Sequence, residues 1–80
     1  MDWRWVFGKF ESETGDGRRL TVERVLSRTG APLNIYEWKI LGPKFIPNHG
    51  HEILKSGRAG NLTMAKNIAA KQAREMDYHA

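Results

Sequence analysis

The sequence predicts an α+β fold, in which three or four strands form an antiparallel meander and one C-terminal helix packs on that sheet. Three observations predict it. Apolar residues alternate in two segments of the first half, a glycine-rich turn lies between extended segments, and small residues recur at helical spacing near the C-terminus. With 80 residues, the chain has room for one small domain, which we place at 1–80.

The first predicted strand covers residues 3–10, where Trp3, Trp5 and Phe7 fall on one face of an extended chain. Residues 11–17 (ESETGDG) are predicted to form the following turn, because glycine supplies the positive φ that tight hairpins need.

Residues 18–29 fit two patterns. Leu20 and Val22 alternate as they would in a strand, whereas Val22, Val25 and Leu26 also fit helical spacing. We favour a strand, because the preceding turn needs a hairpin partner and β-branched residues are frequent here.

The clearest strand pattern covers residues 33–41, where Tyr36, Trp38 and Ile40 share one face. Gly42-Pro43 is expected to end this strand, since proline cannot donate a ladder hydrogen bond.

Residues 44–50 are then predicted to form a loop, and residues 51–56 a short fourth strand. A bend at 57–60 leads into the helix, for which either Asn61 or Thr63 could be the N-cap. Six positions of this helix have the spacing of a core-facing stripe: Ala65, Ile68, Ala69, Gln72, Ala73 and Met76.

Aromatic residues are numerous for a chain of this length, and most are expected in the core. They are Trp3, Trp5, Phe7, Phe10, Tyr36, Trp38, Phe45 and Tyr78. The three tryptophans are predicted to lie on the sheet beneath the helix. A single helix covers only one face of a sheet, so the alternative is that some aromatic residues are exposed as a platform for a partner.

Composition argues against several classes of function. The chain contains no cysteine, which excludes disulfides, thiolate metal sites and a cysteine nucleophile. No apolar run has the ~20 residues of a membrane span, and no basic-then-apolar leader opens the chain, so we expect a cytoplasmic protein without a membrane partner.

Catalytic and metal-binding patterns are also missing. The serines (Ser12, Ser27 and Ser56) lack the context of a nucleophile elbow. The histidines (His49, His51 and His79) have no cysteine or acidic cluster beside them. We therefore expect neither an enzyme nor a metal site, and no cofactor or small-molecule substrate.

Basic residues are concentrated in the second half of the chain. The net charge is +4, and between Lys44 and Arg74 only Glu52 offsets six basic residues: Lys44, Lys55, Arg58, Lys66, Lys71 and Arg74. A contiguous basic face would attract phosphates through counterion release. In the first half, by contrast, arginines alternate with glutamates, and such a mixture suits a protein partner better.

Residues 57–71 (GRAGNLTMAKNIAAK) resemble the last strand-to-helix segment of the double-stranded-RNA-binding domain, in their Ala65-Lys66 and Ala69-Ala70 pairs. The resemblance implies a phosphate contact for Lys66 at the start of the helix. We interpret it chiefly as shared packing of an alanine-rich helix on a sheet.

The overall layout, with a short meander, a Trp-x-Ile strand and a final alanine-rich helix, resembles small phage-encoded accessory proteins, anti-CRISPR proteins among them. The resemblance implies a stoichiometric inhibitor that acts in the host cytoplasm. It assigns no role to any residue.

The leading prediction is therefore a non-enzymatic, phage-type inhibitor that blocks a site on a larger host protein or ribonucleoprotein complex. Its predicted partner-binding residues are Arg18, Arg19, Arg58, Lys66, Lys71 and Arg74. The alternative is a direct nucleic-acid-binding domain that uses the basic face of residues 44–74, through Lys55, Arg58, Lys66, Lys71 and Arg74. A third possibility is an assembly subunit whose free sheet edge pairs with another copy.

Overall fold

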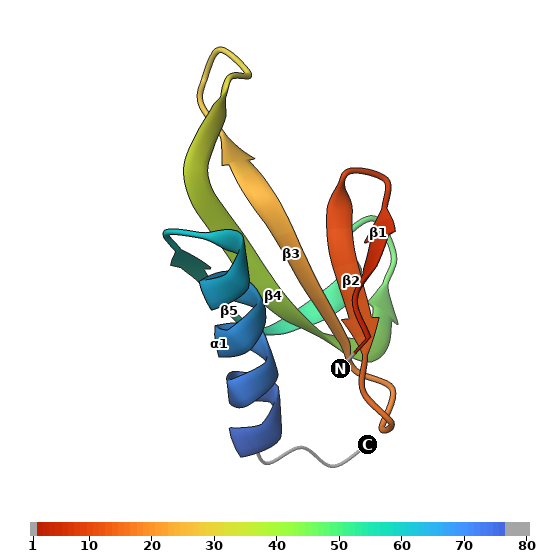
Figure 1. Ribbon diagram of the computed structural model, residues 1–80. Helices are drawn as coiled ribbons and strands as arrows, with labels where there is room; N and C mark the ends of the chain where they lie inside the picture. The colour runs from red at the N-terminus through yellow and green to blue at the C-terminus, as the bar shows by residue number, and fades with distance from the viewer. Residues whose placement is uncertain (1, 77–80) are drawn as a thin grey trace.

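The computed structural model describes residues 2–76, so Tyr78 and His79 lie outside the described residues. Within this part of the chain, five antiparallel strands form a meander in the order β1-β2-β3-β4-β5, and one helix lies across one face (Figure 1). The α+β layout is thus confirmed, with one or two strands more than predicted. The elements are β1 (Arg4–Val6), β2 (Lys9–Glu13), β3 (Arg19–Leu26), β4 (Pro32–Ile46), β5 (Gly50–Ala59) and α1 (Leu62–Glu75).

The additional strand arises within residues 3–10, which form a hairpin and not the single strand predicted. Val6 pairs with Lys9, and the two residues between them have positive φ, 45° at Phe7 and 86° at Gly8. Positive φ at both central positions is the geometry of a type I′ turn, whose usual residues are Asn-Gly or Asp-Gly. A phenylalanine at the first position hides this turn from sequence analysis.

The turn predicted at residues 11–17 is half correct. Strand β2 continues to Glu13 and pairs there with Arg19, so only residues 14–17 form the turn. The Thr14 N–H donates to the Arg18 carbonyl at 3.0 Å and closes it. The preference for a strand within residues 18–29 is confirmed by β3.

Strand β4 does not end at Gly42-Pro43 as predicted. It continues to Ile46, although its register against β5 is irregular between Leu41 and Phe45. Proline is tolerated at such an irregularity, because the regular ladder hydrogen bonds are interrupted there. A Cβ atom at Gly42 would lie 2.5 Å from Glu52 Oε1, so a larger residue here would displace the Glu52 side chain.

The loop predicted at residues 44–50 is accordingly only a tight turn at 47–49. The His49 N–H donates to the Ile46 carbonyl at 3.0 Å, and Asn48 has a φ of 69°. Proline followed by a residue with positive φ is the pattern of a type II turn. Strand β5 then runs to Ala59 and so includes most of the predicted bend at 57–60.

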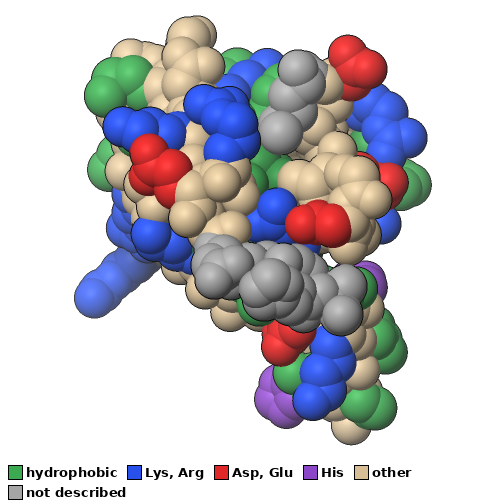
Figure 2. Space-filling model, turned by 90° about the horizontal axis from the view of Figure 1, so that it is seen from below, with side chains coloured by type: hydrophobic (Ala, Val, Ile, Leu, Met, Phe, Trp, Pro, Cys, Tyr) green, Lys and Arg blue, Asp and Glu red, His purple; other side chains and the backbone are tan. Residues whose placement is uncertain are grey.

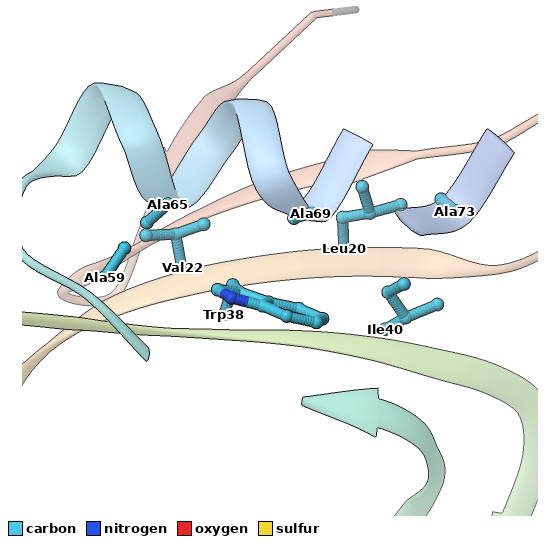
Figure 3. Close-up of a cluster of buried hydrophobic side chains, with 8 residues drawn as sticks. All are labelled: Leu20, Val22, Trp38, Ile40, Ala59, Ala65, Ala69 and Ala73. Atoms are coloured by element: carbon cyan, nitrogen blue, oxygen red, sulfur yellow. The ribbon is translucent and has the colours of Figure 1, made fainter. Parts of the chain in front are cut away.

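The helix packs on the sheet through its alanines, as its spacing predicted. Asn61 is the N-cap, since its side-chain oxygen accepts a hydrogen bond from the Met64 N–H at 2.8 Å. Figure 3 shows the core between helix and sheet, which consists of Leu20, Val22, Trp38, Ile40, Ala59, Ala65, Ala69 and Ala73. Among residues 2–76, no helix is long and apolar enough to cross a lipid bilayer.

The sheet therefore has a covered face beneath α1 and an open face on its other side. Side chains alternate between them, so Leu20 and Val22 are covered whereas Thr21 and Glu23 belong to the open face. Of the tryptophans predicted under the helix, Trp38 is buried there and Trp3 is half-buried against the core. Trp5 instead has 64% of its surface exposed at the β1 edge of the sheet.

Candidate binding surfaces

The open face carries a network of ion pairs. Glu13 lies between two arginines from neighbouring strands, with its Oε1 3.7 Å from Arg4 Nη2 and 3.4 Å from Arg19 Nη2. All three residues lie on the open face, because cross-strand partners share a face and Glu13 pairs directly with Arg19. Arg19, a predicted contact residue, is therefore half-exposed and already has a carboxylate partner.

The network of ion pairs extends across β3, β4 and β5. Lys39 Nζ lies 3.7 Å from Glu23 Oε1 and 3.4 Å from Glu37 Oε1, and Arg58 Nε lies 3.7 Å from Glu37 Oε2. Arg58, which belongs to both predicted sets, is thus an exposed member of the open face. Each surface ion pair contributes little to stability by itself. Together, these pairs give the open face alternating positive and negative charges and not charges of one sign.

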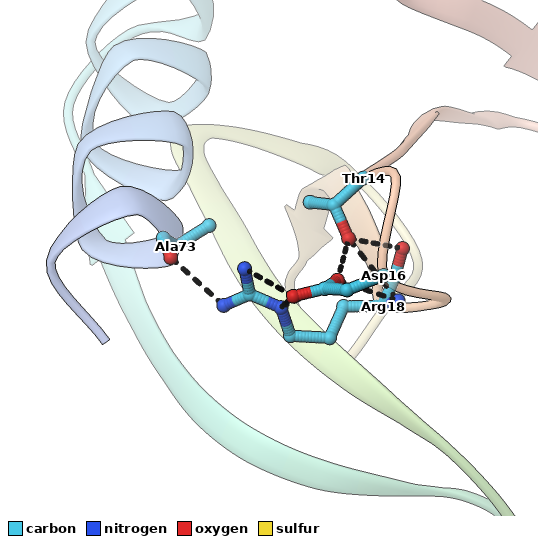
Figure 4. Close-up of polar contacts among 4 residues, drawn as sticks. All are labelled: Thr14, Asp16, Arg18 and Ala73. Atoms are coloured by element: carbon cyan, nitrogen blue, oxygen red, sulfur yellow. Dashed lines mark hydrogen bonds and ion pairs between the residues drawn. The ribbon is translucent and has the colours of Figure 1, made fainter. Parts of the chain in front are cut away.

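Arg18 was predicted to contact a partner, and the structure buries it instead. Its guanidinium lies against the Asp16 carboxylate, with Nη2 3.0 Å from Oδ2, and Nη1 donates to the Ala73 carbonyl at 2.8 Å (Figure 4). The side chain therefore links the β2–β3 turn to the last turn of α1. Hydrogen bonds from Arg18 and Thr14 lower the pKa of Asp16 from 3.8 to about 2. The structure assigns Arg18 to the fold and not to a surface.

Lys66 points along the side of α1 that faces β1 and β2. Its Nζ lies 3.9 Å from the ring centroid of Phe10 and 5.8 Å from that of Trp3. Cations are attracted to the faces of aromatic rings, so this ammonium group is held by the chain's own aromatic residues. A phosphate contact at Lys66, which the double-stranded-RNA-binding resemblance implies, would compete with this arrangement.

The other basic residues around the helix point in different directions. Lys71 lies 3.9 Å from Glu75 on the exposed side of α1, and Lys55 donates a hydrogen bond to Gln72 on the β5 side. Arg74 is exposed beside a shallow hollow of about 380 Å³ next to Trp3. The structure therefore does not gather the five residues of the predicted nucleic-acid face into one groove. In Figure 2, basic and acidic side chains are likewise interspersed over the body.

A hairpin projects from the sheet at the far end of β4 and β5. We call it the finger and define it as residues 42–53. It bends behind β1 and β2 in Figure 1 and forms the lobe at the bottom of Figure 2, where hydrophobic and histidine side chains are visible. Strand β3 pairs with β4 only as far as Leu41, so the paired residues of the finger pair only with residues of β4 and β5. At its base, a Cβ atom at Gly17 of the β2–β3 turn would lie 3.8 Å from Pro43 Cβ.

The exposed side chains of the finger are large and apolar. Phe45 is 63% exposed, Ile53 is 56% exposed, and Ile46 is also exposed. The His51 ring lies edge-on to Phe45, with their centroids 5.6 Å apart. Since Phe45 pairs with His51 and Ile53 follows two residues later, these three side chains share one face of the hairpin.

Sequence analysis missed the finger because residues 44–50 were predicted to be a loop. The available signal was the Pro47-Asn48 pair, which is typical of a tight turn, with apolar residues on both sides of it. The predicted end of the strand at Gly42-Pro43 concealed this signal.

The side chains that commonly bind metal ions are dispersed over the described residues. Within 2–76, no three His, Cys, Asp or Glu side chains are grouped closely enough to hold a metal ion. His49 and His51 both lie in the finger and are exposed. A hollow of about 800 Å³ lies beside Arg18 and is bordered by Arg4, Glu13 and Arg74, so its charges are mixed.

No protein-family model matches the chain, and comparison with curated proteins and with solved structures found no match. The resemblances to phage accessory proteins and to the double-stranded-RNA-binding domain therefore stay predictions.

Proposed function

We propose that the protein is a non-enzymatic binding protein that docks on a larger protein or ribonucleoprotein through its finger. The observation that carries this proposal is the exposure of Phe45 and Ile53 on a hairpin that extends beyond the last residue of β4 paired with β3. Burial of a Phe or Ile side chain is worth roughly 1.5–3 kcal/mol, so leaving two of them in water forgoes considerable stability. Aromatic residues on a protruding element are frequent anchors of protein interfaces.

The open face supports a protein partner over a polyanion. Its arginines and lysines have carboxylates within 4 Å, as in the pairs Arg4–Glu13, Arg19–Glu13 and Arg58–Glu37. A phosphate backbone would have to displace these carboxylates or meet their repulsion. A protein surface with its own alternating charges can match them and gain specificity and register.

Inhibition by occlusion is the mode of action that we propose for this docking. The chain has only 80 residues, and its layout resembles that of phage-encoded inhibitors. Such a protein acts by covering a site, so it must bind at a fixed stoichiometry and with slow dissociation.

The test uses a variant with both finger anchors truncated, Phe45→Ala with Ile53→Ala. Tagged wild-type protein is used to capture partners from nuclease-treated lysate of the source cells, and the dissociation constant for the captured partner is then measured. We expect a 1:1 complex that survives nuclease and that the double variant weakens by roughly 100-fold, since hot-spot truncations often cost ~2 kcal/mol each, with partial non-additivity.

Leu26→Ala is the matched control, because Leu26 on β3 is 59% exposed, close to the 63% of Phe45 and 56% of Ile53, and lies outside the finger. The control should bind the same partner as tightly as the wild type. An unchanged dissociation constant for the double variant, with its folding verified by circular dichroism, would contradict the proposal. So would loss of all captured protein after nuclease treatment.

Direct nucleic-acid binding is the competing outcome. Fluorescence anisotropy with duplex DNA, duplex RNA and single strands, at roughly 50 and 200 mM salt, tests it. Micromolar binding that falls several-fold with salt and disappears on Lys66→Glu with Lys71→Glu would place this function first. Because Lys66 and Lys71 already have partners within the chain, we expect no such binding.

A further inference from the structure

A second apolar surface lies on the covered face, between the β1–β2 hairpin and the start of α1. Here the β1–β2 hairpin, β3, β4 and the first turn of α1 enclose a pocket of about 170 Å³. We call it the aromatic pocket, and its apolar walls are Trp5, Phe10, Val22, Tyr36 and Leu62. A cavity of ~150 Å³ with apolar walls is large enough to hold a benzene ring.

The outer wall of the aromatic pocket stays open to solvent. The Trp5 ring packs edge-on against Phe10, with centroids 4.8 Å apart and an interplanar angle of 68°. Trp5 nevertheless keeps 64% of its surface exposed, so it borders the pocket without filling it. Phe7, two residues along the same hairpin, is fully exposed and has a φ of 45°, an unfavourable conformation for an aromatic residue. Since the Trp5 and Phe7 side chains are mostly in water, they contribute less to the stability of the fold than they would if they were buried.

Two cations are held beside the rings of the pocket. The Arg24 guanidinium lies 5.9 Å from the centroid of Tyr36, and its position is fixed by hydrogen bonds to the Leu33 carbonyl and the Asn34 side chain. Lys66 Nζ lies 3.9 Å from the centroid of Phe10. The pocket itself is lined by one arginine, Arg24, and one glutamate, Glu23, which has Lys39 on the open face as its ion-pair partner at 3.7 Å. With Lys66 next to Phe10, basic groups therefore outnumber acidic ones around the pocket.

We propose that the aromatic pocket receives one apolar side chain, phenylalanine or leucine, from an acidic segment of a protein partner. The volume fits one such side chain, and the walls bury it against aromatic rings. Arg24 and Lys66 attract carboxylates on either side of that residue. The same cations would attract a nucleotide phosphate, but a nucleobase would lose hydration of its polar edge against Val22 and Leu62.

The aromatic pocket is a site separate from the finger, so it can be tested without knowing the partner of the finger. Suitable probes are the blocked tripeptide Asp-Phe-Asp, the matched Asp-Ala-Asp and adenosine monophosphate. Each is titrated into the full chain labelled with ¹⁵N, and the indole N–H signal of Trp5 and the amide signal of Leu62 are followed by NMR. We expect saturable shifts with Asp-Phe-Asp in the millimolar range, and binding of Asp-Ala-Asp that is at least tenfold weaker.

Two variants locate the binding. Trp5→Ala removes the outer wall and should weaken Asp-Phe-Asp at least tenfold, whereas Phe45→Ala, an equally exposed aromatic truncation on the finger, should leave it unchanged. Since Trp5 is largely exposed, its truncation is expected to preserve the fold, and the signals of the core residues Val22 and Ile40 check this. Equal binding of the Phe and Ala peptides, tighter binding of adenosine monophosphate, or no saturable shift would each overturn the proposal.

Discussion

Gly57 lies closely against the rigid indole ring of Trp38, and this contact yields a sharp prediction. They are direct cross-strand partners on β5 and β4, and Trp38 is 5% exposed beneath the helix. A Cβ atom at Gly57 would lie 2.6 Å from Trp38 Cζ2, 2.8 Å from Cε2 and 2.9 Å from Nε1. Those are rigid ring atoms of a buried side chain, so they cannot swing away.

We therefore expect Gly57→Ala to destabilise the protein. Overpacking of a core costs ~1–3 kcal/mol. Alanine has lower backbone entropy than glycine in the unfolded chain, which offsets about 0.5 kcal/mol of this cost. The offset applies here because φ at Gly57 is not in the left-handed region. The net loss of about 0.5–2.5 kcal/mol corresponds to a fall in Tm of roughly 2–20 °C for a domain of this size.

Urea denaturation followed by tryptophan fluorescence measures this loss. Gly60→Ala is the matched control, since no atom lies within 4 Å of its Cβ position and its φ is not positive. Trp38→Phe removes the ring atoms that clash with the alanine. It should therefore lower the free energy of unfolding less in the Gly57→Ala background than in the wild type, with a coupling energy between the two substitutions of about 1 kcal/mol. Equal stability of the two alanine variants, or zero coupling, would refute the reasoning.

Three further substitutions test other parts of the fold. Asn61→Ala removes the helix N-cap and should cost about 1 kcal/mol in urea denaturation, whereas Thr63→Ala should cost less than half of that. Phe7→Asn places the preferred residue in the type I′ turn and should stabilise the protein by about 1 kcal/mol, and a loss of stability would show that Phe7 packs on something. The folded pKa of Asp16, about 2, lies below its ordinary value of 3.8, so folding favours the carboxylate. This stabilising contribution is complete above pH 4 and is lost as the pH falls towards 2. Asp16→Asn should therefore be less stable than the wild type at pH 7. In thermal denaturation, its Tm should also fall less between pH 4 and pH 2 than the Tm of the wild type. Parallel curves for Asp16→Asn and the wild type would contradict this.

The elements that sequence analysis predicted correctly are those whose periodicity is strong enough to outweigh other signals. The alternation around Trp38 and the helical spacing of Ala65, Ala69 and Ala73 reflect burial against each other, and the structure confirms both. The errors occur where pairing with a distant strand overrides a local signal. Gly42-Pro43 is a strand breaker by itself, yet β5 pairs with the residues on both sides of it.

Candidate site residues were harder to predict, because exposure depends on contacts that are distant in the sequence. Arg18 is indistinguishable from its neighbour Arg19 in composition or spacing. Only the fold brings the Ala73 carbonyl within 2.8 Å of one of them and carries the other to the open face. The exposure of Phe45 on the finger is likewise set by how β4 and β5 leave the sheet together, which no local pattern encodes.

The number of charged residues in the sequence does not describe how charge is distributed on the surface. The chain has a net charge of +4, and the second half has the larger excess of basic residues. The open face, however, joins Arg58 from that half to Glu37, and Arg4 to Glu13, through strand register. Because side chains alternate with a period of two, a shift of one residue in the pairing of β5 with β4 would separate Arg58 from Glu37 and turn it to the face beneath the helix. The polarity that a partner meets is therefore a property of the register, and the hydrophobic pairs beneath the helix that fix this register also determine the binding surface on the other face.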